Sequence, residues 1–130
     1  MIFKKIESEK APKPGGCYSQ AIQMGNLIFT SGQLPVDPVS GKFIYDGIEK
    51  QVVRVLENIK AILEDNGSSL EHVIKATIFI SNIKHWDAVN KIYSDYFKNS
   101  LPPARSIITC SEIHHGLEIE MEVIAFIPSI

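Results

Sequence analysis

Between residues 117 and 126, apolar and acidic side chains alternate one by one, and this alternation constrains the fold more than any other feature of the sequence. The apolar positions are Leu117, Ile119, Met121 and Val123, and the acidic ones are Glu118, Glu120 and Glu122. Successive side chains of a β-strand point to opposite faces. We therefore expect a strand that buries one face and leaves the glutamates on the other, within a sheet that carries a second layer.

Four further segments are predicted to be strands: residues 21–24, 27–30, 73–80 and 104–110. The first two are separated by Gly25-Asn26, a pair that tolerates positive φ and favours a tight hairpin. The segment 73–80 is rich in β-branched residues, and its alternation places Ile74 on the same face as Ala76 and Ile78. Between these strands, residues 34–41 combine two prolines with Asp, Ser and Gly, which predicts a loop.

Two segments show apolar residues at helical spacing, which predicts helices over roughly residues 47–65 and 83–98. Asp46 is expected to cap the first helix, with Glu49 as its capping-box partner, and Asn66-Gly67 to end it. The two prolines that follow residue 101 prevent the second helix from continuing.

The order of these elements predicts a single α+β domain over residues 1–130, with one sheet and both helices on one of its faces. The opposite face of such a sheet also needs cover, and a chain of 130 residues has no further element to supply it. Oligomerisation is therefore expected.

Composition excludes few classes of function. The formal net charge is −2, so the sequence lacks the excess of Lys and Arg that nucleic-acid binding normally needs, and neither RNA nor DNA is an expected partner. The sequence contains no signal-peptide pattern and no apolar run long enough to span a membrane. These features favour a cytoplasmic protein with no membrane partner.

Cys17 and Cys110 are the only cysteines, and they are expected to be free thiols. Cys110 with His114 and His115 is a weak candidate for a metal site, because the spacing of a structural zinc site is missing. Cys17 or Cys110 with either histidine is a weak candidate for a nucleophilic site. A loop with two solvated histidines is the simpler interpretation. No glycine-rich nucleotide-binding motif is present, so no nucleotide cofactor is expected, and the missing zinc-site spacing means that no metal is expected either.

Several polar residues could form a site, although each has an ordinary structural alternative. Arg105 enters a strand directly after rigid prolines and could bind a carboxylate, or it could be solvated. One of the three glutamates could lie in a cleft, where burial raises the pKa of a carboxyl group and suits it to proton transfer. Loops around residues 15–18 and 30–33 could bind a small anion, whereas Asn90 on its own favours a surface position.

Five segments together resemble the RidA family, also called YjgF or L-PSP, across nearly the whole chain. These segments are Gly16-Cys17-Tyr18-Ser19-Gln20-Ala21, Ser31-Gly32-Gln33-Leu34-Pro35, Asn90-Lys91-Ile92-Tyr93, Pro103-Ala104-Arg105-Ser106 and Ile119-Glu120-Met121-Glu122-Val123-Ile124-Ala125. The resemblance implies a chorismate-mutase-like α+β fold and a homotrimer with three clefts between neighbouring subunits.

The resemblance also implies roles for individual residues. Arg105 would pair with a substrate carboxylate, and Glu120 would activate water. Residues that would line or support the cleft are Tyr18, Ser31, Gly32, Asn90 and, through its backbone, Ile107. The implied activity is that of a 2-iminobutanoate/2-iminopropanoate deaminase, which hydrolyses the enamines and imines released by pyridoxal-phosphate enzymes to 2-keto acids and ammonia, with no cofactor of its own.

The sequence departs from the family pattern at three places. Cys17 stands where many deaminating members have Pro, Ile107 where they have Cys, and His114-His115 where they have Leu-Pro. Two alternatives therefore accompany the deaminase hypothesis. One is a non-catalytic trimeric sensor or binding module for 2-keto acids or amino acids, and the other is an endoribonuclease or translation inhibitor.

Overall fold

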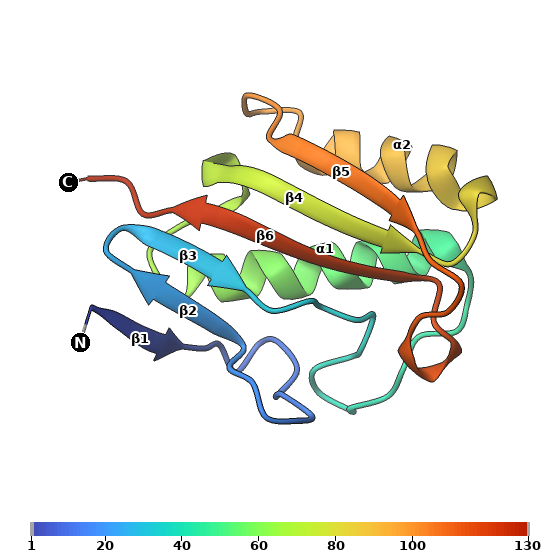
Figure 1. The fold of residues 1–130 in the computed structure, drawn as a ribbon, viewed down its shortest axis with the longest axis horizontal. Helices are drawn as coiled ribbons and strands as arrows, with labels where there is room; N and C mark the ends of the chain where they lie inside the picture. The colour runs from blue at the N-terminus through green and yellow to red at the C-terminus, as the bar shows by residue number, and fades with distance from the viewer. Residues whose placement is uncertain (1, 130) are drawn as a thin grey trace.

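The computed structural model describes residues 2–129 and contains one six-stranded mixed sheet (Figure 1). The strands are β1 (Phe3–Ile6), β2 (Ala21–Met24), β3 (Leu27–Thr30), β4 (Val73–Ile80), β5 (Ala104–Thr109) and β6 (Ile119–Phe126). They lie in the order β1-β2-β3-β6-β4-β5, and only β5 runs parallel to its neighbour, β4. The predicted alternation in β6 is confirmed, because Ile119, Met121 and Val123 are buried between more exposed neighbours.

Both α-helices, α1 (Ile48–Glu64) and α2 (Trp86–Tyr96), cover one face of this sheet, behind the strands in the view of Figure 1. The stripe of α1 includes Val55, Ile59 and Ile62, all fully buried in the core, where α1 packs against β6 and α2. The predicted α+β architecture, with one sheet and two helices on one face, is confirmed. Within residues 2–129, no helix is both long enough and apolar enough to cross a membrane.

Helix α2 is the crossover that lets β5 run parallel to β4. A 3-10 turn, Ile83–His85, precedes it, and the side chain of Asn82 caps this turn by accepting a hydrogen bond from the Lys84 N–H. Two other 3-10 turns, Leu70–His72 and His114–Gly116, precede β4 and β6. The second predicted helix is thus confirmed, but its first turn is a 3-10 turn.

The predicted cap of α1 is wrong. Gly47 occupies the N-cap position with φ 107°, and no side chain caps the helix there. Asp46 lies one residue too early, and its carboxylate instead forms an exposed ion pair with Lys50 at 3.8 Å. The predicted end is correct, because Gly67 takes the left-handed conformation with φ 82° just after the helix.

Two other differences from the sequence-based expectation concern strands. Strand β1 was not predicted, and it forms by pairing antiparallel with β2 at one edge of the sheet. Ile74 was expected on the buried face, but a β-bulge between Val73 and Lys75 shifts the alternation. Val73 is therefore buried, and Ile74 is 46% exposed.

The sheet face opposite the helices carries many apolar side chains. The register places Phe29 and Ile124 side by side on this face, together with Ile22 and Phe79. Ile108 lies on the same face of β5 and is 44% exposed. This face therefore has the apolar character that we expected of a surface buried by association.

Candidate functional site

Arg105 lies on the edge strand β5, on the sheet face that packs against α2. Its neighbour on β4, Ala76, is fully buried under the helices. The guanidinium donates a hydrogen bond from Nη1 to Oδ1 of Asn90 at 2.8 Å. Its Cζ lies 4.8 Å from the ring centroid of Tyr93 and 5.5 Å from that of Trp86. The three α2 side chains hold the cation in place by one hydrogen bond and two cation–π contacts.

The Arg105 guanidinium keeps donors free for a ligand. No acidic side chain among residues 2–129 forms an ion pair with it, so the positive charge is not neutralised within the described part of the chain. A guanidinium has five N–H donors in a planar fork, and a carboxylate can accept two of them in parallel. Ile107 follows on the same face of β5, and half of the backbone groups on an edge strand point away from the sheet.

Two members of this cluster were not identified from the sequence as site residues. Trp86 and Tyr93 are among the apolar residues at helical spacing that predict the second helix. Tyr93 is indeed only 5% exposed, and burial raises the pKa of its hydroxyl, while the charge of Arg105 opposes this shift. Their spacing from Asn90, four residues before and three after, could have indicated a shared helix face beside Arg105.

Glu120 lies on the opposite face of the sheet, on β6. Backbone hydrogen bonds between Gln33 and Met121, of 2.7 and 3.1 Å, hold the segment after β3 beside β6. The Glu120 carboxylate rests directly over Gly32, where an added Cβ would come within 2.7 Å of Oε1. Burial and the nearby charge of Glu122 raise the pKa of Glu120, and His114 partly opposes this shift. Raising the pKa of a carboxyl group moves it toward neutral pH, which favours a role in proton transfer.

The other two predicted residues are near Gly32 in the chain or in space. The Ser31 hydroxyl donates to the Ser19 carbonyl at 2.6 Å, so it joins two loops. Tyr18 is 52% exposed, and its hydroxyl accepts a hydrogen bond from the Gly15 N–H. Tyr18 and Gly32 line a hollow of about 1000 Å³. The predicted site residues therefore form two groups, one around Arg105 and one around Glu120.

These two groups do not meet within one chain. Strand β4 separates β5 from β6, and the register sets Arg105 beside Ala76 but Glu120 beside Phe79, on the other face. Neighbouring strands lie about 4.8 Å apart, so two strand spacings and the thickness of the sheet separate the two residues. If Arg105 and Glu120 act on one ligand, they must come from different copies of the chain.

The comparisons with known proteins agree with this fold and these motifs. The family model described as Endoribonuclease L-PSP matches residues 8–127. The chain belongs to the RidA/YjgF (L-PSP) family. A RutC family protein of Pyrococcus abyssi is 47% identical over 126 residues, which cover 97% of this chain and 98% of that protein.

Solved structures of RidA/YjgF proteins have the same fold. A protein of the conserved Rid family from Yersinia pestis superimposes with a TM-score of 0.93 at 43% identity, covering 95% of this chain and 98% of the other. TdcF of E. coli, solved with bound serine, superimposes with a TM-score of 0.90 at 34% identity, with coverage of 95% and 98%.

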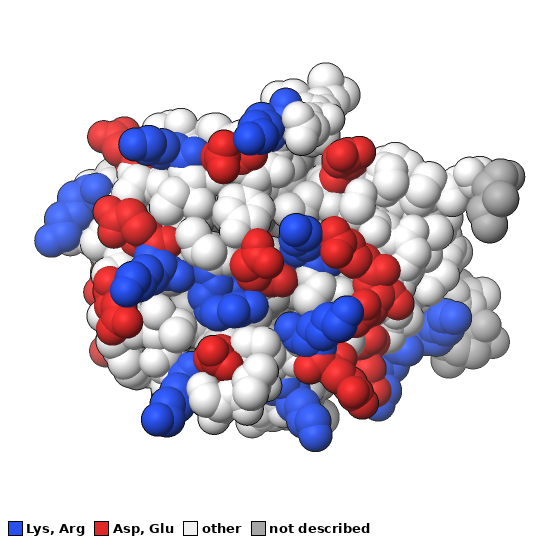
Figure 2. Space-filling view, turned by 180° about the vertical axis from the view of Figure 1, so that it is seen from behind, with Lys and Arg blue, Asp and Glu red and all other residues white. Residues whose placement is uncertain are grey.

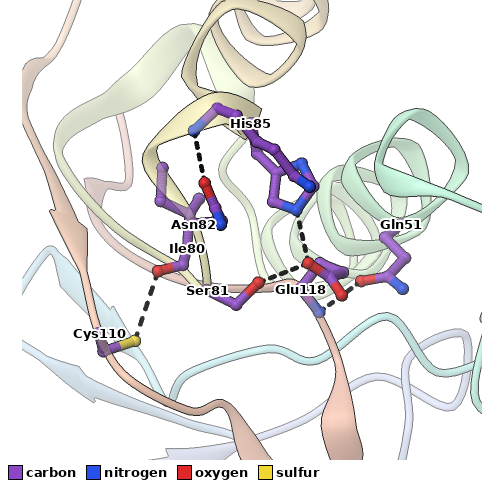
Figure 3. A network of polar contacts seen from close by, with 8 residues as sticks. Gln51, Ile80, Ser81, Asn82, His85, Cys110 and Glu118 are labelled. Carbon is purple, nitrogen blue, oxygen red and sulfur yellow. Dashed lines mark hydrogen bonds and ion pairs between the residues drawn. The ribbon is translucent and has the colours of Figure 1, made fainter.

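One polar network of this RidA-family chain was not foreseen (Figure 3). The Glu118 carboxylate accepts hydrogen bonds from the Ser81 hydroxyl and the His85 ring, and the buried Gln51 side chain accepts one from the Glu118 N–H at 2.8 Å. The network connects the end of β4, the start of α2 and the start of β6. It therefore fixes the strand that carries Glu120 relative to the helix that holds Arg105.

Cys17 and Cys110 are free, as predicted. The Cys110 thiol donates a hydrogen bond to the Ile80 carbonyl at 3.6 Å, next to the Glu118 network. Among residues 2–129, no group of three or more His, Cys, Asp or Glu side chains is arranged to hold a metal ion.

Replacing Glu118 by Gln is expected to lower the free energy of unfolding by about 1 kcal/mol at pH 7, because a partly exposed, charge-assisted network is lost. Ser81 and His85 lower the pKa of Glu118 in the folded state. The stabilisation by the Glu118 carboxylate is therefore present when the pH is above its pKa in the unfolded state. It is lost as the pH falls through its pKa in the folded state. Urea unfolding of the wild type and of Glu118→Gln should show that the difference in their free energies of unfolding shrinks from pH 7 to pH 3. Glu122→Gln, at an exposed position, is the control and should lose no comparable stability at pH 7.

Replacing Gly32 by Ala is expected to displace the Glu120 carboxylate, because the new Cβ would overlap it. A shift of about 1 Å in a catalytic group can reduce a rate about a hundredfold. We therefore expect a loss of this order in kcat/KM for the activity proposed below, with a smaller change in Tm. Gly15→Ala is the matched control, since its added Cβ meets no atom within 4 Å. Equal losses in both variants would contradict the role of Gly32.

Proposed function

We propose that this protein hydrolyses 2-imino acids and their enamine tautomers, such as 2-iminopropanoate and 2-iminobutanoate, to 2-keto acids and ammonia. One observation carries the proposal: a guanidinium with free donors and a carboxyl group with a raised pKa lie on opposite faces of one sheet. The first suits a carboxylate and the second suits proton transfer, as the hydrolysis of an imino acid requires.

We further propose that the two groups meet in clefts between copies of a homotrimer. The apolar side chains on the open sheet face, among them Phe29 and Ile108, supply the surface that such an assembly would bury. A cyclic assembly brings one face of each copy against a different face of the next. Three equivalent clefts would result, each with Arg105 from one subunit and Glu120 from its neighbour.

The reaction then follows from the two groups. Arg105 binds the carboxylate and thereby positions the imine carbon, which is already electrophilic. Glu120 accepts a proton from water while the water oxygen forms a bond to this carbon. The carboxyl group then gives this proton to the imine nitrogen, which yields a hydroxy amine. Glu120 next takes the hydroxyl proton and passes it to the same nitrogen, so that the C=O bond forms, the C–N bond breaks, and ammonia leaves with the 2-keto acid as the other product. Water supplies the oxygen and both protons, so neither an oxidant nor a cofactor is consumed.

The relatives support a small carboxylate as the ligand, because TdcF of E. coli was solved with bound serine. The same observation favours a second candidate function, a module that binds an amino acid or keto acid without turnover.

Endoribonuclease activity, suggested by the family description, is less well supported. The net charge is −2, and the helix-covered face in Figure 2 shows Lys and Arg interspersed with Asp and Glu.

The proposal is tested by adding the protein to a serine or threonine dehydratase reaction that contains semicarbazide, which competes for the imine. Faster release of keto acid is expected with the wild type. Arg105→Ala should reduce kcat/KM by about a hundredfold or more, because two charge-assisted hydrogen bonds are lost. Arg54→Ala, which removes the only other arginine, is the control. No acceleration with either substrate, together with measurable keto-acid binding, would favour the binding module.

A further inference from the structure

Three aromatic rings form a column at the hollow beside Glu120. The rings of Phe43 and His115 are stacked, with centroids 4.2 Å apart and an interplanar angle of 27°. The His114 ring completes the column at a tilt, with its centroid 3.8 Å from that of His115 and an interplanar angle of 49°. All three residues line the same hollow as Tyr18 and Gly32. Figure 1 shows how this arises, since the loop after β3 and the loop before β6 lie side by side.

The backbone that presents this column is strained. His115 has φ 61°, the only positive φ of a residue other than glycine among residues 2–129, and Gly116 follows with φ 68°. A left-handed conformation at such a residue costs about 1–3 kcal/mol and persists only where the surroundings impose it. Here the Tyr45 hydroxyl donates to the His115 carbonyl at 2.8 Å and braces the turn. Strain of this kind is concentrated at ligand-binding sites.

The column lies within reach of the proposed reaction centre. His114 is near enough to Glu120 for its charge to affect the pKa of that carboxyl group. Gly32 lies under the Glu120 carboxylate and also lines the hollow. A substrate whose imine carbon is at Glu120 can therefore extend its side chain toward the rings. The hollow of about 1000 Å³ is far larger than the methyl group of 2-iminopropanoate requires.

The other residues that line the hollow indicate which substrate side chains it can bind. Pro12, Val36 and Pro38 contribute apolar surface. Glu9 and Asp37 also line it, and Lys13 is the only Lys or Arg in the lining. A second carboxylate on the substrate would thus meet two like charges, whereas a flat apolar ring would meet ring faces and proline.

We propose that the column of Phe43, His115 and His114 is the side-chain subsite of the cleft and selects imino acids with a planar aromatic side chain. This inference rests on the proposed function and deepens it by naming the substrate class. Its basis is the position of the rings, their braced backbone and the charges of the lining.

The test compares three imines in the semicarbazide assay: those of phenylalanine and of glutamate, generated by amino-acid oxidases, and 2-iminopropanoate from serine dehydratase. We expect kcat/KM to be at least about tenfold higher for the phenylalanine imine than for 2-iminopropanoate. His115→Gly, which keeps the left-handed backbone, and His114→Ala should each lower this ratio severalfold. His72→Ala is the matched control, because its ring packs at a tilt against Phe126 and does not line the hollow.

The outcomes separate the inference from the function on which it rests. Equal or better turnover of 2-iminopropanoate, or a preference for the glutamate imine, would overturn the aromatic subsite and leave imine hydrolysis standing. If no imine is hydrolysed, calorimetry with phenylpyruvate and pyruvate decides. Tighter binding of phenylpyruvate that depends on His114 and His115 would support the subsite without the reaction, and equal binding would overturn both.

Discussion

Mixed oligomers of two inactive variants are expected to recover activity. Arg105→Ala subunits keep Glu120, and Glu120→Gln subunits keep Arg105, so an active cleft forms wherever the two kinds adjoin in the right order. Random assembly of equal amounts should give about a quarter of the wild-type activity. Refolding the two variants together and assaying keto-acid release would measure it. The result follows from the register, which sets the two side chains on opposite faces of one chain.

The same experiment carries its own controls. The two variants mixed without refolding should stay inactive if subunits do not exchange. Wild type refolded with the double variant should also reach about a quarter of full activity if the residues act between chains, but about half if they act within one. Mixed oligomers, detected by mass spectrometry, that show no recovery would refute the shared cleft.

Replacing Glu120 by Gln is expected to lower kcat about 10²- to 10⁴-fold, the usual contribution of a general acid or base. Binding of a keto acid should change little, because Arg105 is intact. Single-turnover assays and calorimetry would separate the two effects. Gln keeps the size of Glu and removes only its charge and its ability to exchange protons, so unchanged turnover would exclude Glu120 as the proton carrier.

Glu120→Gln should also raise the free energy of unfolding, although it lowers activity. Burial and Glu122 raise the pKa of Glu120 in the folded state. A carboxyl group of this kind favours folding most when it is protonated, and this contribution is lost as the pH rises through the folded pKa. Glu120→Gln should therefore be more stable than the wild type at pH 7, and the difference should disappear at acidic pH. Lower stability at pH 7 would show that the charged carboxylate is well satisfied.

Local signals accounted for most of the fold. The hairpin at Gly25, the stripe of α1 and the alternation of β6 each follow from the spacing of a few residues. Strand β1 has no such signal, because only Ile6 of its four residues is buried and its edge position comes from pairing with β2. The bulge at Val73 is also invisible in the sequence, since it depends on how β4 aligns with β6.

The site was predictable as a set of residues but not as an arrangement. The motifs indicated Arg105 and Glu120, and only the strand register showed that they face opposite ways. Glu118 looked like any solvated glutamate, because its partners Ser81 and His85 lie more than thirty residues away in the sequence. Spacing along a chain reports which residues share a face, whereas contacts between distant segments appear only in the folded molecule.

The free donors of Arg105 have a consequence for how the protein would work among its own products. A 2-keto acid keeps the carboxylate of the imine from which it was made, so a guanidinium that recognises this group binds both. Accumulated keto acid should therefore compete for the cleft, and acetate or citrate used as assay buffers should compete as well. The cleft can then distinguish substrate from product only by the imine nitrogen, which the keto acid lacks. Activity should therefore fall as the ratio of keto acid to imine rises.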